Sequence, residues 1–205
     1  MTKAILFDLD GVVVVNKGKK FSERLSEKLG IPLERISEFF INDFKECSFG
    51  RADLKVKIAP YLVKWGYKGT AEDLLQFWFE DEGTADKEVL RVVADLRSKG
   101  VRCYIATRQE KYRKEYLLEQ VGLRDHFDGI FCTCDVGFDK SEKGYWDYVF
   151  NELDLRPEEI MFFCDGKKNV DVAEGLGVQA YFYDGIDLLK ERTRERLSET
   201  DIDIH

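Results

Sequence analysis

The hydrophobic pattern of the chain changes soon after the amino terminus. Residues 3–8 form a short apolar run that ends in an acidic turn containing glycine, as expected of a buried parallel strand. From about residue 22 to residue 82 the apolar positions recur at helical spacing instead, and no strand pattern interrupts them. This stretch predicts helices over residues 22–29, 33–47, 52–65 with an interruption at Pro60, and 71–81.

The rest of the chain alternates between helical patterns and short apolar runs. Helices are predicted over residues 87–99, 109–121, 141–153 and 170–176, and strands over residues 101–106, 129–134, 160–164 and 178–183. Strands that alternate with helices predict an α/β fold with a parallel doubly wound sheet. The charge-rich stretch 191–199 is interpreted as the solvated face of a helix.

Composition narrows the possible partners and surroundings. The net charge is -8, and the densest basic cluster is only Lys17, Lys19 and Lys20, so a nucleic acid partner is not expected. The apolar runs are too short to span a membrane. Five cysteines without a preceding signal peptide favour a soluble protein of the reducing cytoplasm. Cys132 and Cys134 are expected on one face of a strand, without the further ligands of a zinc site.

Polar residues stand at the predicted carboxyl ends of the strands. Asp8 and Asp10 follow the first strand, Thr107 ends the second, Lys140 precedes a helix, and Asp165 follows the fourth strand. Each alone has an ordinary explanation as a turn residue or an exposed lysine. In a parallel sheet, however, all of them fall on the edge where functional groups gather. We therefore expect one site.

These residues together match the needs of phosphoryl transfer to a carboxylate. Asp8 would attack phosphorus, and Asp10 would protonate the leaving oxygen and later activate water. Asp8, the main-chain carbonyl of Asp10 and Asp165 offer oxygen ligands for Mg²⁺. Thr107 and Lys140 would hold the phosphate oxygens. The sequence thus predicts a Mg²⁺-dependent reaction on a phosphate ester.

Four ordered segments resemble the motifs of the haloacid dehalogenase superfamily. The resemblance runs in order over nearly the whole chain and implies catalysis through an aspartyl-phosphate, most like sugar-phosphate phosphatases and the amino-terminal phosphatase domain of epoxide hydrolases. An acid at Asp10 separates the chain from the metal-independent dehalogenases. The segments are Asp8-Leu-Asp10-Gly-Val-Val, Ile105-Ala-Thr107, Gly137-Phe-Asp-Lys140 and Phe163-Cys-Asp165-Gly-Lys-Lys-Asn169.

The resemblance also implies an architecture. A Rossmann-like parallel core, residues 1–14 and 86–205, would carry an α-helical cap inserted after the first motif, residues 15–85. The cap position agrees with the helical stretch that the hydrophobic pattern predicts. The oligomeric state stays open.

Three positions raise questions about the details of the site. Arg108 stands where asparagine is common in the family, and it is either a further phosphate contact or an exposed arginine. Cys164 replaces a usual acid beside Asp165, so the resemblance implies one carboxylate fewer around the metal, with Cys164 and Asn169 beside it. Arg51, in the helical stretch, is interpreted as a surface residue in preference to a contact with the leaving group.

Two other functions remain open from the residues. A phosphomutase of the same fold would use the same aspartates, and a non-catalytic phosphate-binding regulatory protein could retain the fold. The presence of both Asp8 and Asp10 favours an active enzyme. The expected partner is a small-molecule phosphate ester, whose identity depends on cap loops that the sequence does not resolve.

Overall fold

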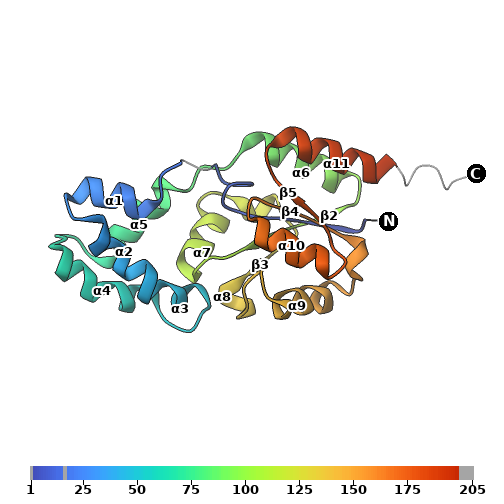
Figure 1. Ribbon diagram of the computed structural model, residues 1–205. Helices are drawn as coiled ribbons and strands as arrows, with labels where there is room; N and C mark the ends of the chain where they lie inside the picture. Colours follow the sequence, from blue (N-terminus) through green and yellow to red (C-terminus); the bar gives the residue numbers. More distant parts are fainter. Residues whose placement is uncertain (1, 16–17, 199–205) are drawn as a thin grey trace, which may run out of the picture.

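A parallel sheet forms the centre of the α/β part of the molecule (Figure 1). The computed structural model describes residues 2–15 and 18–198. Its strands are β1 (Ala4–Phe7), β2 (Arg102–Thr107), β3 (Gly129–Cys132), β4 (Ile160–Cys164) and β5 (Gln179–Phe182). They pair in parallel in the order β3-β2-β1-β4-β5, so β1 lies at the centre between β2 and β4. The predicted parallel doubly wound α/β fold is confirmed.

Helices cover both faces of this sheet because β1 is apolar on both of its sides. Ile5 and Phe7 pack into one hydrophobic cluster, and Ala4 and Leu6 pack into another on the opposite face. Residues of α6 (Lys87–Ser98), α7 (Lys111–Glu119) and α11 (Ile186–Ser198) join the first cluster, and residues of α8 (Thr133–Val136), α9 (Lys143–Leu153) and α10 (Lys167–Gly175) join the second. Two short 3-10 helices, η1 (Leu123–Asp125) and η2 (Pro157–Glu159), precede β3 and β4.

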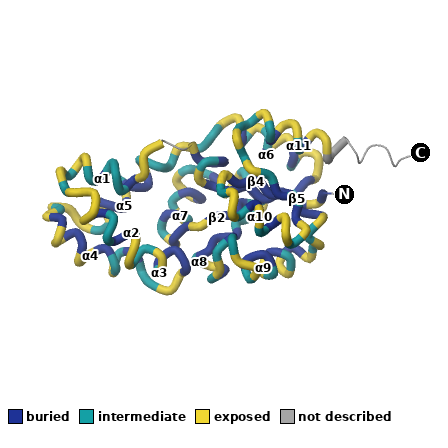
Figure 2. Tube along the Cα trace, in the orientation of Figure 1, coloured by how far each residue is buried: buried dark blue, intermediate teal, exposed yellow. Residues whose placement is uncertain are grey.

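The helices between β1 and α6 have a hydrophobic cluster of their own. They are α1 (Phe21–Leu29), α2 (Leu33–Asn42), α3 (Phe44–Ser48), α4 (Leu54–Trp65) and α5 (Ala71–Asp81). Aromatic rings dominate this cluster, including Phe39, Trp65 and Trp78. Figure 2 shows buried segments inside this group as well as within the sheet. We propose on this basis that residues 15–85 form the cap and residues 1–14 and 86–205 the core.

Two helix predictions in the cap are wrong in detail. The predicted helix 33–47 is two helices that meet at Asp43, whose carboxylate accepts hydrogen bonds from Lys57 Nζ (2.9 Å) and Tyr61 Oη (2.6 Å) of α4. Pro60 does not interrupt α4. Proline has no amide hydrogen, so Pro60 leaves the carbonyl of Val56 without its helical donor. Val56 is 71% exposed, so water can donate to this carbonyl instead.

The predicted strand 129–134 is wrong at its carboxyl end. The strand stops at Cys132, and the chain turns at once into α8, where Thr133 Oγ1 donates a hydrogen bond to the carbonyl of Ser48 in α3 (2.6 Å). Cys132 and Cys134 therefore do not alternate along a strand. The turn brings their sulfur atoms to 3.1 Å from each other.

Smaller differences concern helix boundaries and the chain end. α10 begins at Lys167, earlier than the predicted residue 170, and the amides of Asn169 (2.9 Å) and Val170 (3.2 Å) donate to the carbonyl of Gly166 at its start. Residues 191–198 lie in a helix as predicted, but Thr193 is buried, so this stretch is not solvated throughout, and residue 199 lies outside the described residues. Within the described part of the chain, none of the helices combines the length and the apolar character needed to cross a membrane.

Candidate functional site

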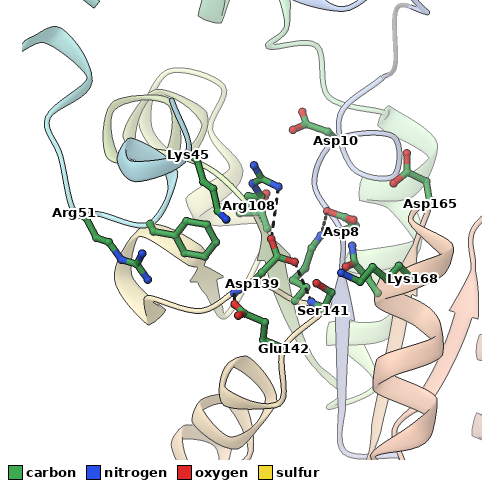
Figure 3. Close-up of a pocket in the computed structure, with 14 residues that line it drawn as sticks. Asp8, Asp10, Lys45, Arg51, Arg108, Asp139, Ser141, Glu142, Asp165 and Lys168 are labelled. Carbon is green, nitrogen blue, oxygen red and sulfur yellow. Dashed lines mark hydrogen bonds and ion pairs between the residues drawn. The ribbon is translucent and has the colours of Figure 1, made fainter. Parts of the chain in front are cut away.

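The carboxyl ends of the three central strands open into one cavity. Asp8 follows β1, Thr107 ends β2 and Asp165 follows β4, so parallel pairing of these strands brings the three side chains to the same edge. The cavity has a volume of about 710 Å³. Figure 3 shows it between this edge and a segment of the cap. Its lining comprises Asp8, Asp10, Lys45, Phe49, Arg51, Thr107, Arg108, Asp139, Lys140, Ser141, Glu142, Asp165, Lys168 and Asn169.

Asp8 lies at the floor of the cavity, and donors contact both of its carboxylate oxygens. It is 6% exposed, and its Oδ1 accepts a hydrogen bond from the amide of Leu9 (2.8 Å) and lies 2.5 Å from Lys140 Nζ. Its Oδ2 accepts from Cys164 Sγ at 2.7 Å. The carboxylate group of Asp8 is thus held in one orientation, as a candidate nucleophile requires.

Lys140 and Cys164 differ in charge although both are buried. Burial lowers the pKa of Lys140, but the neighbouring Asp8 carboxylate raises it, and the net direction is upward, so the ammonium group stays charged. Burial raises the pKa of Cys164 to about 12, which keeps the thiol neutral. The pair therefore offers Asp8 one cationic and one neutral donor.

Cys164 has a contact that the sequence did not predict. The expectation was a side chain beside the metal, whereas the structure places its sulfur directly against Asp8. The amide of Gly166 (3.3 Å) and Asn169 Nδ2 (3.6 Å) donate to the same sulfur. Asn169 thus reaches the site through Cys164, and it also lines the cavity.

A cluster of possible metal ligands lies beside Asp8. One ligand atom each of Asp8, Cys164 and Asp165 lies within 4.8 Å of the others. The pKa of Asp165 is raised, first by burial and then by the charge of Asp8, so the two carboxylates repel each other here. A hard divalent cation that prefers oxygen ligands would relieve this repulsion. The donor set therefore fits Mg²⁺, with the thiol too soft to be a preferred ligand.

Gly11 permits the position of Asp165. A Cβ atom on Gly11 would lie only 2.2 Å from Asp165 Oδ2, and the φ angle of this glycine is +80°. Only glycine adopts that backbone angle readily and leaves room for the carboxylate. The turn after β1 therefore needs glycine at position 11 to leave space for the Asp165 carboxylate.

Asp10 lines the cavity but turns away from Asp8 (Figure 3). Its Oδ1 accepts a hydrogen bond from Arg113 Nη2 (2.7 Å), and its Oδ2 accepts from Arg113 Nη1 (3.0 Å) and Gln109 Nε2 (2.5 Å). The side chain of Arg113 is 6% exposed, whereas that of Asp10 is 52% exposed. A buried arginine thus holds Asp10, the candidate general acid, in an orientation that faces away from Asp8.

Sequence reasoning missed Arg113 and Gln109. Both fall in the predicted helix 109–121, where charged and polar residues are normally interpreted as a solvated face. The spacing of four residues places them on one side of the helix start, and Gln109 Oε1 accepts a hydrogen bond from Arg113 Nη1 (2.9 Å). That spacing was the one available signal, and it does not reveal burial.

The remaining predicted residues divide between the floor and the mouth of the cavity. Thr107 is only 1% exposed, at the floor. Arg108 has a side chain that is 48% exposed, and its Nη1 lies 3.6 Å from Asp139 Oδ2. Arg51, interpreted from sequence as a surface residue, is 56% exposed and also lines the cavity. Their roles toward a phosphate stay predictions.

Comparisons with known proteins show which family and fold the chain resembles. The chain is 20% identical to D-ribitol-5-phosphate phosphatase from Bacteroides thetaiotaomicron, over 88% of this chain and 91% of the relative. It is 24% identical to bifunctional epoxide hydrolase 2 from Sus scrofa, over 86% of this chain but only 35% of that protein. The crystal structure of a HAD family enzyme from B. thetaiotaomicron, in complex with magnesium and inorganic phosphate, superposes with a TM-score of 0.76 at 19% identity, covering 88% of this chain and 93% of that one. The family model of haloacid dehalogenase-like hydrolases matches residues 2–177, and the chain therefore belongs to this family.

Proposed function

We propose that this protein is a Mg²⁺-dependent phosphatase that hydrolyses a small phosphorylated metabolite through an aspartyl-phosphate on Asp8. The observation that carries the proposal is the buried Asp8 carboxylate, oriented by Lys140 and Cys164 at the floor of a cavity that Asp165 also lines. Two comparisons support it: a relative named as a phosphatase, and a structural neighbour crystallised with magnesium and phosphate.

The proposed reaction has two steps on the same phosphorus atom. In the first, a carboxylate oxygen of Asp8 bonds to phosphorus, and the bond from phosphorus to the leaving oxygen breaks as Asp10 donates a proton to that oxygen. In the second, Asp10 takes a proton from water, whose oxygen bonds to phosphorus while the bond to Asp8 breaks. Inorganic phosphate leaves, and Asp8 is free again. Lys140 and Thr107 stabilise the equatorial oxygens throughout.

Asp10 has to change its orientation for this role. Its carboxylate faces away from Asp8 and is held by Arg113 and Gln109. To reach the leaving oxygen it exchanges these partners for the substrate. We infer that substrate binding and this exchange occur together, because a leaving group in the cavity gives Asp10 a new hydrogen-bond partner.

Asp8, Asp165 and the main-chain carbonyl of Asp10 would hold the Mg²⁺ ion. When bound, it would supply positive charge against the phosphate dianion and the carboxylates, which Lys140 alone does not balance.

The proposed function is tested by phosphate release. Purified protein is incubated with p-nitrophenyl phosphate and with a series of sugar phosphates, with Mg²⁺ and after exhaustive treatment with EDTA. We expect inorganic phosphate with Mg²⁺, loss of activity after chelation, and recovery when Mg²⁺ is returned. Full activity without metal would contradict the proposal. An isomeric sugar phosphate in place of inorganic phosphate would identify a phosphomutase.

Replacing Gly11 by alanine should weaken Mg²⁺ activation by about tenfold or more, since its Cβ would displace the Asp165 carboxylate from its place near Asp8. The measurement is the Mg²⁺ concentration at half-maximal activity. Gly100→Ala is the matched control, because Gly100 has a φ angle of +83° but no atom within 4 Å of the added Cβ. It should cost about 1–2 kcal/mol of stability from backbone strain and leave the Mg²⁺ midpoint unchanged. Equal Mg²⁺ midpoints in the two variants would exclude the role given to Gly11.

Cys164→Asp tests whether the missing family carboxylate limits metal affinity. The new carboxylate would face Asp8, because the sulfur it replaces lies 2.7 Å from Asp8 Oδ2. We expect the Mg²⁺ midpoint to fall roughly tenfold. Without Mg²⁺, the melting temperature should drop, because two carboxylates then face each other at a buried position.

Cys164→Ser is the control for this change. The hydroxyl keeps a neutral donor toward Asp8, so the Mg²⁺ midpoint should stay near that of the unmodified protein. A midpoint for Cys164→Asp that is unchanged or higher would refute the role of position 164 at the metal site.

A further inference from the structure

The cavity continues from the floor at Asp8 toward the cap. Its outer end is lined by Lys45, Phe49 and Arg51 of the cap and by Arg108 of the core. A phosphate held by Lys140 at the floor would direct the leaving group of the ester into this outer end. The residues there therefore decide which leaving groups fit.

Among the described residues, the cations Lys45, Arg51 and Arg108 at the outer end have long ion pairs or none. Arg108 Nη1 lies 3.6 Å from Asp139, and Arg51 Nη1 lies 3.7 Å from Glu46, both beyond ordinary hydrogen-bond distance. Within residues 2–15 and 18–198, Lys45 has no carboxylate within ion-pair distance, and its ammonium group only approaches the ring of Phe49, at 5.9 Å.

The acids of this end have other contacts. Asp139 Oδ1 accepts a hydrogen bond from the amide of Ser141 (3.0 Å), and Glu142 Oε2 accepts from the amide of Asp139 (2.7 Å). In Figure 3, the charged ends of Lys45 and Arg108 turn toward the same part of the cavity, one from the cap and one from the core. Two like charges that face a shared space favour a negative group between them.

The cap segment that carries Lys45 packs against α8 of the core. Thr133 Oγ1 of α8 donates to the carbonyl of Ser48 at 2.6 Å. Gly50 lies so close to α8 that a Cβ atom on it would be 2.1 Å from the carbonyl oxygen of Cys134. Lys45 and Phe49 thus belong to a segment whose backbone contacts α8 of the core, and both line the cavity.

We propose that the leaving group of the substrate carries a second anionic group, a carboxylate, which binds between Lys45 and Arg108. This rests on the proposed phosphatase function and names its substrate class. The anion would offset the two cations at the outer end, while Asp8 and Lys140 act on the phosphate ester at the floor. With a neutral polyol phosphate, Arg108 would have only the Asp139 carboxylate at 3.6 Å, and Lys45 would have no carboxylate partner among the described residues.

A matched pair of esters tests the proposal. 3-Phosphoglycerate and glycerol 3-phosphate have the same carbon chain, but only the first has a carboxylate at the far end. Binding of each is measured by calorimetry to the unmodified protein after treatment with EDTA, when no turnover is expected. The ratio of kcat/KM for the two esters with the unmodified protein is a second measurement. We expect a preference of about tenfold for the carboxylate, typical of a charge-assisted contact.

Lys45→Gln should reduce this preference to about threefold or less, since one charge-assisted contact is lost. Lys64→Gln removes the same charge from the cap at α4, where Lys64 Nζ lies 3.4 Å from Glu38 and outside the cavity lining. It should leave the preference unchanged.

Equal affinity for the two esters, or no binding of either, would overturn the inference. An equal loss of preference in Lys64→Gln and Lys45→Gln would also overturn it, because the effect would then come from overall charge. The two failures are distinguishable. Absence of phosphate release from every ester contradicts the proposed function, whereas release from p-nitrophenyl phosphate without a preference between the matched esters contradicts only the anionic leaving group.

Discussion

Replacing Asp8 by asparagine should lower phosphate release by roughly 10⁴-fold or more, because an amide cannot form the phospho-enzyme and the remaining groups only bind and orient. The measurement is inorganic phosphate release at saturating Mg²⁺ and substrate. Turnover close to that of the unmodified protein would remove Asp8 from the nucleophile role.

The structure shows that this variant needs a control for stability. Asp8 is the carboxylate partner of Lys140, which is itself only 4% exposed. Asp8→Asn leaves that ammonium group without its nearest counter-charge, and removing one partner of a buried pair is destabilising. Asp8→Glu keeps a carboxylate near Lys140 but moves the reacting oxygen by one methylene. We expect Asp8→Glu to be inactive as well, with a melting temperature closer to that of the unmodified protein. Loss of activity in both variants, with both still folded, assigns the loss to chemistry.

Arg113→Leu should lower the free energy of unfolding by about 2–4 kcal/mol, because it leaves polar partners unpaired in a buried place. Arg113 donates to Asp10, to Gln109 and to the carbonyl of Glu82 (3.3 Å). The expected loss in the free energy of unfolding lies toward the lower end for buried pairs because Asp10 is half exposed and can be hydrated. Denaturant unfolding at neutral pH measures the change.

The contact between Arg113 and Asp10 is isolated by a double-mutant cycle. Asp10→Asn alone, Arg113→Leu alone and the double variant should show a coupling of about 0.5–3 kcal/mol in the free energy of unfolding. Arg97→Leu is the matched control, since Arg97 bonds to Asp128 at 2.9 Å but its side chain is 35% exposed. It should cost about 1 kcal/mol or less. Additive effects of the Asp10 and Arg113 changes would show that the buried arginine does not hold the candidate acid.

The order of apolar runs and helical patterns along the sequence determined the central parallel sheet. A strand buried on both faces is an uninterrupted apolar run, so β1 and β4 are visible in the sequence as residues 3–8 and 160–164. Alternation of such runs with helices implies parallel pairing, and parallel pairing puts every strand's carboxyl end on one edge. Asp8, Thr107 and Asp165 could therefore be placed together from the sequence, because each needs only its own strand and the direction of the sheet.

Local signals failed where a distant contact decides the backbone. The strand after residue 129 ends at Cys132 because the next residue bonds to the cap at Ser48, and helix 33–47 divides at Asp43, whose carboxylate bonds to α4. Ser48 is 85 positions from Thr133, far outside the window from which periodicity is judged, and Lys57 belongs to a different helix from Asp43.

The finer chemistry of the site was decided by tertiary structure alone. Cys164 reaches Asp8 across 156 positions of the chain, and Arg113 reaches Asp10 across 103. The direction of a side chain and its burial depend on how whole elements pack, so an arginine in a helix gives no sign in the sequence of the carboxylate it will meet. The position of Lys45 in the cavity lining likewise depends on how the cap packs against the core. The sequence thus determined the fold and which candidate groups meet at one edge of the sheet, whereas packing determined which donors hold them and which cations line the outer end of the cavity.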